Sequence, residues 1–89
     1  MRIIEADLRH IDTPEALQVY LGYILRAPAW YGQNLDALYD ILTEIVRPTR
    51  LIVLPPEKET ERMIAYWPRF IRVLNDAADI CPAFSWEKR

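Results

Sequence analysis

The chain has 89 residues, of which 52% are hydrophobic and only two are glycine, and its formal net charge is −2. This length allows one hydrophobic core, so we expect a single domain over residues 1–89, and the apolar content excludes an intrinsically disordered chain. The small negative charge gives no electrostatic reason to bind nucleic acid or an anionic membrane. No stretch approaches the roughly 20 apolar residues of a membrane-spanning helix, and the first residues lack the apolar run of a signal peptide. We therefore expect a cytoplasmic protein.

Cysteine and histidine each occur once, which limits the chemistry of the chain. Cys81 alone cannot form an intramolecular disulfide, and we expect it to be a small buried residue. His10 alone excludes sites built from two histidines. The sequence therefore predicts no metal site, no cofactor and no catalytic residue.

The first half of the chain predicts one strand and two helices. Arg2–Ala6 is rich in β-branched residues and is expected to form a strand. Thr13 can cap a helix that has Pro14 in its first turn and ends before Pro28. After a loop, Asn34 can cap a second helix from about Leu35 to Val46.

The second half predicts two strands and two further helices. The apolar run at 50–54 is consistent with a strand buried on both faces. A polar helix over 57–65, a separate helix from Pro68 to about residue 78 and a short strand over 83–86 follow. Strands that alternate with helices imply an α/β fold, with a small three-stranded parallel sheet packed with helices.

The second helix carries the most unusual pattern. At 100° per residue its apolar side chains share one face, while Asp36, Asp40 and Thr43 lie opposite and Tyr39 lies at the boundary. Between Ala27 and Val46 the chain has three acidic residues and no lysine or arginine. The apolar face is expected to consist of Leu35, Leu38, Ile41, Leu42 and Ile45.

Asp40 is locally unfavourable, which makes it a candidate functional residue. An acid in the first helical turn, such as Asp36, is stabilising, but Asp40 lies beyond that turn and repels Asp36 at i+4. Two adjacent aromatics in the preceding loop are typical of interface anchors, and we expect Trp30 to point outward and Tyr31 inward. The alternative is a solvated helix face with incidental acids.

A family resemblance rests on residues 30–43, which read Trp-Tyr-Gly-Gln-Asn-Leu-Asp-Ala-Leu-Tyr-Asp-Ile-Leu-Thr. They resemble the signature of the barstar family of ribonuclease inhibitors, in which Asn-Leu-Asp-Ala-Leu-aromatic-Asp opens the second helix. The resemblance implies a barstar-like fold and a one-to-one, non-enzymatic inhibitor of a basic, guanyl-type ribonuclease resembling barnase. The second helix and the loop before it would plug the enzyme's cationic active site.

The resemblance also assigns roles to individual residues. Asp40 matches the aspartate that enters the phosphate-binding site, Asp36 matches a second helix acid near the guanine-binding loop, and Trp30 replaces an aromatic that stacks on the catalytic histidine. Other positions match loop and helix contacts, and one acid of the last helix matches a further family acid. The predicted partner-binding residues are Trp30, Gly32, Asn34, Leu35, Asp36, Tyr39, Asp40, Thr43 and Asp76.

Some residues depart from the family pattern or allow other interpretations. Ile45 stands where the family has an interface tryptophan, and Arg47 stands where it has an acid. The helical wheel places Arg47 beside Asp36 and Asp40. There it would repel a cationic partner, or it would pair with an acidic residue specific to this protein's partner. Asp76 could instead form a surface pair with Arg72 at i−4.

Three further alternatives concern the class of function. An acidic pair could suggest a hydrolase, but a convex solvated helix offers no cleft that would perturb one carboxyl group, so we do not expect an enzyme. An immunity protein against a competitor's ribonuclease toxin would use the same fold and helix. A regulatory module could use the acidic helix to bind a different basic protein. In each case we expect the free protein to be a monomer.

Overall fold

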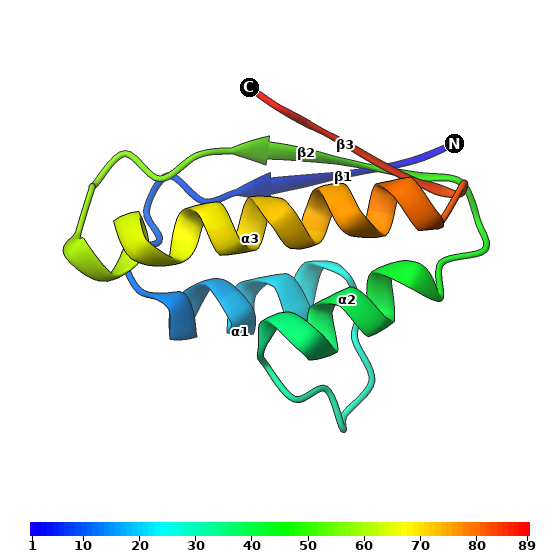
Figure 1. Ribbon diagram of the computed structural model, residues 1–89, viewed down its shortest axis with the longest axis horizontal. Helices are drawn as coiled ribbons and strands as arrows, with labels where there is room; N and C mark the ends of the chain where they lie inside the picture. Colours follow the sequence, from blue (N-terminus) through cyan, green and yellow to red (C-terminus); the bar gives the residue numbers. More distant parts are fainter.

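The computed structural model describes residues 1–89 and has three helices packed on a three-stranded parallel sheet (Figure 1). The strand order is β1-β2-β3, and the register places Ile4 beside Leu51, which in turn lies beside Trp86. The predicted α/β fold and parallel sheet are confirmed. In chain order the elements are β1 (Arg2–Asp7), α1 (Pro14–Ile24), α2 (Leu35–Thr43), β2 (Thr49–Leu54), α3 (Glu61–Ile80) and β3 (Phe84–Lys88).

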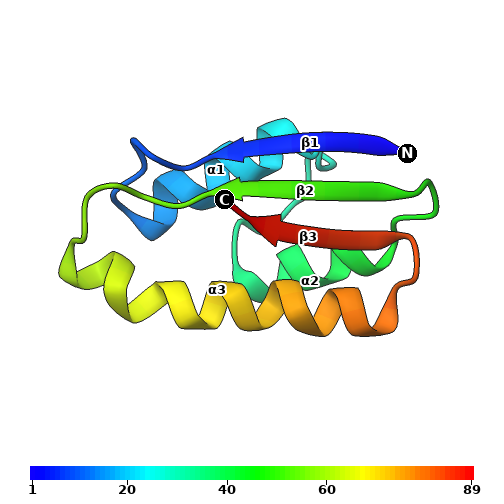
Figure 2. The same cartoon turned by 90° about the horizontal axis from the view of Figure 1, so that it is seen from above.

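All three helices lie on the same face of the sheet, and Figure 2 looks onto the opposite face. Parallel crossovers are right-handed, so two crossovers that step in the same direction bring their helices to one side. β2 is therefore covered by helices on one face only, and the expected burial on both faces holds for only part of the strand. Arg50 is exposed on the open face, whereas Ile52 is only 4% exposed because its strand is central and has neighbours on both sides.

Each helix begins at a polar cap. The side chains of Thr13, Asn34 and Thr60 accept hydrogen bonds from the backbone N–H three residues later, at 3.1, 2.8 and 3.2 Å. The first two caps agree with the sequence prediction. Thr60 also donates to the carbonyl oxygen of Asp12 at 3.0 Å, which joins the start of α3 to the segment before α1.

α2 ends earlier than predicted, at Thr43. Arg47 therefore lies beyond the helix, and the wheel position that placed it beside Asp36 and Asp40 was wrong. The chain must leave the helix before Pro48, which disfavours helical geometry at the residue before it. β2 then begins at Thr49.

α3 is one helix of 20 residues, although the sequence predicted two helices separated near Pro68. Pro68 lacks an N–H and costs about 3 kcal/mol in a helix interior. The buried residues of α3 nevertheless continue across it, with Met63 before the proline and Phe70, Leu74 and Ala77 after it. Burial of several such side chains, each worth about 1.5–3 kcal/mol, outweighs the local penalty.

The hydrophobic core lies between the sheet and the helices and contains 14 buried residues. Leu17 and Leu21 of α1, Leu38 and Leu42 of α2 and the buried residues of α3 meet there. Cys81 is buried at its edge, as predicted, and His10 is exposed. No helix is both long enough and apolar enough to cross a membrane.

A candidate protein-binding groove between α2 and α3

α2 has the amphipathic orientation that its sequence predicted. Leu38 and Leu42 are fully buried, while Asp36 and Asp40 are exposed on the other side. The remaining predicted core residues, Leu35, Ile41 and Ile45, are partly buried and pack against the core. The core contacts of one face therefore hold the two aspartates outward.

An open groove runs between α2 and α3. Leu35, Asp36, Tyr39 and Asp40 line it from α2, and the facing helix contributes Val73, Asp76, Asp79 and Ile80. Apolar and aromatic side chains thus alternate with carboxylates along one surface. The groove brings together five of the predicted partner-binding residues, namely Leu35, Asp36, Tyr39, Asp40 and Asp76.

The negative charge of this groove is not balanced by basic residues in its lining. Its lining includes four aspartates and no lysine or arginine, although the whole chain has a net charge of only −2. Asp36, Asp40 and Asp79 form no salt bridge with any residue of the chain. The one cation in reach is Arg72, whose Nε lies 3.9 Å from Oδ2 of Asp76, and both side chains of this pair are largely exposed.

Asp79 was not among the predicted residues. Its spacing of three from Asp76 places both carboxylates on one face of α3, which is a signal that the sequence contained. What the sequence did not contain was the packing of that face beside α2. No group of three or more His, Cys, Asp or Glu side chains is arranged to hold a metal ion.

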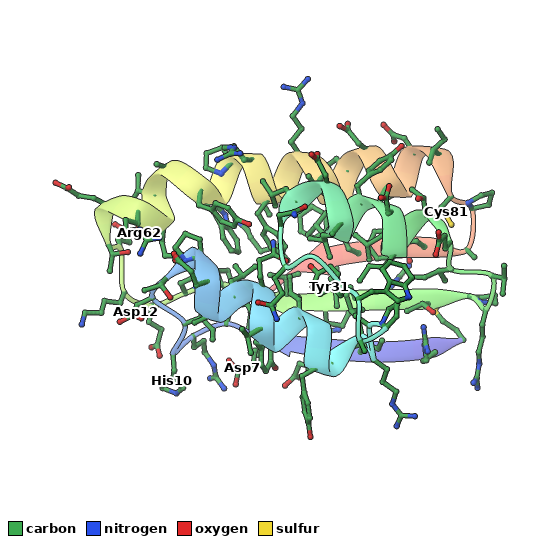
Figure 3. All side chains as sticks on the ribbon, turned by 90° about the horizontal axis from the view of Figure 1, so that it is seen from below. Asp7, His10, Asp12, Tyr31, Arg62 and Cys81 are labelled. Carbon is green, nitrogen blue, oxygen red and sulfur yellow. The ribbon has the colours of Figure 1, made fainter.

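In the loop before α2, one aromatic side chain is exposed to solvent and the other is partly buried. Trp30 is 72% exposed, whereas Tyr31 is half-buried, as expected. Figure 3 looks onto the helices and shows Tyr31 between α1 and α2. Trp30 is therefore available to a partner on the loop that precedes the acidic helix.

Three predicted residues serve the local structure of α2 and do not line the groove. Asn34 caps the helix, and its Nδ2 also donates to the carbonyl oxygen of Gly32 at 3.3 Å. A Cβ on Gly32 would lie 3.1 Å from that same Nδ2, so the glycine leaves room for the cap. The Thr43 hydroxyl donates to the carbonyl oxygen of Tyr39 at 2.9 Å, within the helix.

The exposed tryptophan, the capped helix and the α2 side of the groove belong to residues that resemble the barstar signature, and the comparison over the whole chain decides the family. The profile of the family described as barstar (barnase inhibitor) matches residues 1–87. The chain belongs to the barstar family. No curated protein sequence matches it. Barstar-family proteins are non-enzymatic inhibitors of barnase-type ribonucleases, so the predicted family and the absence of an enzymatic activity are confirmed.

Proposed function

We propose that the protein inhibits a basic, guanyl-type ribonuclease in the cytoplasm by one-to-one binding, and that the acidic groove and the loop before α2 enter the enzyme's active site. Four carboxylates on one groove, without a lysine or arginine between them, are the observation that supports this surface. A ribonuclease needs a cationic site to hold phosphate groups. A row of carboxylates offers such a site the same charge as RNA.

The positions of the side chains suggest which part of the contact with the enzyme each residue makes. Asp40 and Asp36 have no ion-pair partner within the chain, so arginine or histidine side chains of the enzyme would be their first partners. Asp76 and Asp79 would extend the contact along α3. Trp30 would supply a large exposed ring from the loop before α2, which is typical of an interface anchor.

The remaining predicted residues would shape this surface. Leu35 and Tyr39 supply apolar area within the groove. Gly32 and Asn34 fix the first turn of α2, and Thr43 bonds within its last turn. Their effect on binding would therefore come largely through the position of Asp36 and Asp40.

A titration of ribonuclease activity tests the proposal. RNA cleavage by a barnase-like enzyme from the same organism is measured with increasing amounts of wild type, Asp40→Asn and Glu59→Gln. Glu59 is an exposed acid outside the groove, so its variant removes the same charge from a different surface. Removing one partner of an ion pair that becomes buried costs about 3–5 kcal/mol, so Asp40→Asn should raise Kd more than a hundredfold.

The expected result is complete inhibition at one equivalent by wild type and Glu59→Gln, with a large loss only in Asp40→Asn. Equal inhibition by both variants would contradict the role of the groove. Full ribonuclease activity in excess wild type, tested against every barnase-like enzyme of the organism, would contradict the proposed target. Binding of another basic protein that Asp40→Asn abolishes would then favour the regulatory alternative, and inhibition of a competitor's toxin alone would favour an immunity protein.

A further inference from the structure

A buried polar cluster connects the loop before α2 to two helices. Gln18 of α1 is 2% exposed, and both ends of its side-chain amide are used. The Tyr31 hydroxyl donates to Oε1 of Gln18, and Nε2 of Gln18 donates to the Tyr66 hydroxyl of α3 at 2.7 Å. The loop, α1 and α3 thus share one chain of hydrogen bonds.

Tyr31 also fits sterically against α1. A Cβ on Gly22 would lie 3.2 Å from Cδ2 and 3.4 Å from Cε2 of the Tyr31 ring, so the absence of a side chain at Gly22 gives this ring its place. Burial raises the pKa of Tyr31, with a further contribution from Tyr66. The hydroxyl therefore remains a protonated donor over the whole physiological pH range.

The other hydrogen bonds of this loop are local. The N–H of Tyr31 bonds to the carbonyl oxygen of Pro28 at 2.9 Å, and the Asn34 side chain bonds to Gly32 and to the first turn of α2. The Tyr31 hydroxyl supplies the one hydrogen bond that joins residues 28–33 to α1. Trp30, its direct neighbour in the sequence, is 72% exposed.

We propose that Tyr31, bonded to Gln18 and seated against Gly22, is a positioning residue that orders the loop and presents Trp30 before a partner arrives. This inference rests on the proposed ribonuclease-binding function. A loop that is already ordered loses less conformational entropy on binding, and this smaller entropy cost lowers Kd. Gln18 is buried and cannot touch the partner, so its contribution would act only through Tyr31.

Three variants test the cluster in the free protein and in the complex. Tyr31→Phe keeps the ring and removes the donor. Tyr31→Phe combined with Gln18→Met removes the donor and its acceptor together, so the Gln18 oxygen is not left unpaired if the single variant is unstable; it also removes the hydrogen bond from Gln18 to Tyr66. Tyr20→Phe is the matched control, because the Tyr20 hydroxyl accepts a hydrogen bond from the backbone of Asp7 at 3.0 Å, away from the loop.

Amide hydrogen exchange over residues 29–34 is measured in the free proteins, and Kd and binding stoichiometry are measured by calorimetry against the ribonuclease. Loss of the Tyr31–Gln18 hydrogen bond, which both Tyr31 variants share, should accelerate loop exchange and raise Kd by about two- to tenfold, at unchanged stoichiometry. Tyr20→Phe should match wild type in both measurements. A merely structural role of Tyr31 would lower the fraction of binding-competent protein and leave Kd unchanged.

Unchanged loop exchange in both Tyr31 variants would overturn the inference, as would a loosened loop with an unchanged Kd. If wild type binds no ribonuclease, the proposed function fails, and the positioning role toward that partner fails with it. The exchange measurement separates these failures, because it reports on the free protein and needs no partner.

Discussion

Replacing Asp40 with alanine should stabilise the free protein even though it weakens the complex. The Asp40 side chain is exposed and forms no salt bridge, so its removal breaks no ion pair within the chain. The change relieves a like-charge pair with Asp36 at i+4, worth about 0.2–0.5 kcal/mol. It also replaces a poor interior helix former with the best one, worth up to about 0.7 kcal/mol. The free energy of unfolding should therefore rise by about 0.5–1 kcal/mol.

Urea unfolding followed by tryptophan fluorescence measures this change, and a rise in Tm of about 2–8 °C should accompany it. Asp36→Ala is the matched control, since it relieves the same repulsion but also removes a favourable charge from the first helical turn, worth about 0.3–1 kcal/mol. Its net effect should be close to zero. If Asp40→Ala instead destabilises the protein by more than about 1 kcal/mol, Asp40 serves the fold, and the interpretation of this face as a binding surface is wrong.

Three further changes test the structural account. Pro68→Ala should raise the free energy of unfolding by about 2 kcal/mol in a urea titration, because the regained helix hydrogen bond and relieved clash exceed the entropy that proline removes from the unfolded chain; an unchanged or lower stability would contradict an uninterrupted α3. Asn34→Ala should lower stability by about 1 kcal/mol and reduce helical circular dichroism, since the cap of α2 is lost; an unaltered α2 would refute that role. Hydrogen bonds from Arg9 lower the pKa of Asp7 from 3.8 to about 2, so the stabilisation from this pair is present above about pH 4 and is lost as the pH falls through 2. In an NMR titration, Arg9→Gln should return the pKa of Asp7 toward 3.8. An unchanged pKa would exclude Arg9 as the cause of the shift.

Local rules were sufficient for most of the secondary structure. Thr13 and Asn34 are caps because their side chains satisfy N–H groups within three residues, an interaction that depends on sequence neighbours alone. The wheel of α2 was equally local, and it separated the buried Leu38 and Leu42 from the exposed Asp36 correctly.

The errors arose where tertiary packing outweighed a local preference. Pro68 is a strong local signal for a helix end, yet the core contacts of Met63 and Phe70 hold α3 together across it. The apolar run of β2 indicated burial on both faces, but helices cover only one face; on the other face Arg50 is exposed and Ile52 is shielded by the neighbouring strands. Neither effect can be derived from the residues near the proline or within the strand.

The α2 side of the candidate groove could be predicted from the sequence, but most of its α3 side could not. The α2 residues follow from the wheel and from the barstar resemblance, and Asp76 was expected from the same resemblance. Asp79 was missed because its importance depends on which face of α3 packs beside α2, a long-range contact that the sequence pattern does not specify. Arg47 was instead assigned to this surface incorrectly. A helical projection placed it beside the two aspartates, but it lies outside the helix.

The central claim is that the groove between α2 and α3 is the surface that binds the ribonuclease. Amide hydrogen exchange of the free protein and of its complex with the enzyme tests this claim most directly. The account predicts slower exchange over residues 30–43 and 72–80 in the complex, with no change on the open face of the sheet around Ile3 and Arg50. Protection confined to the open face of the sheet, with α2 unchanged, would contradict it.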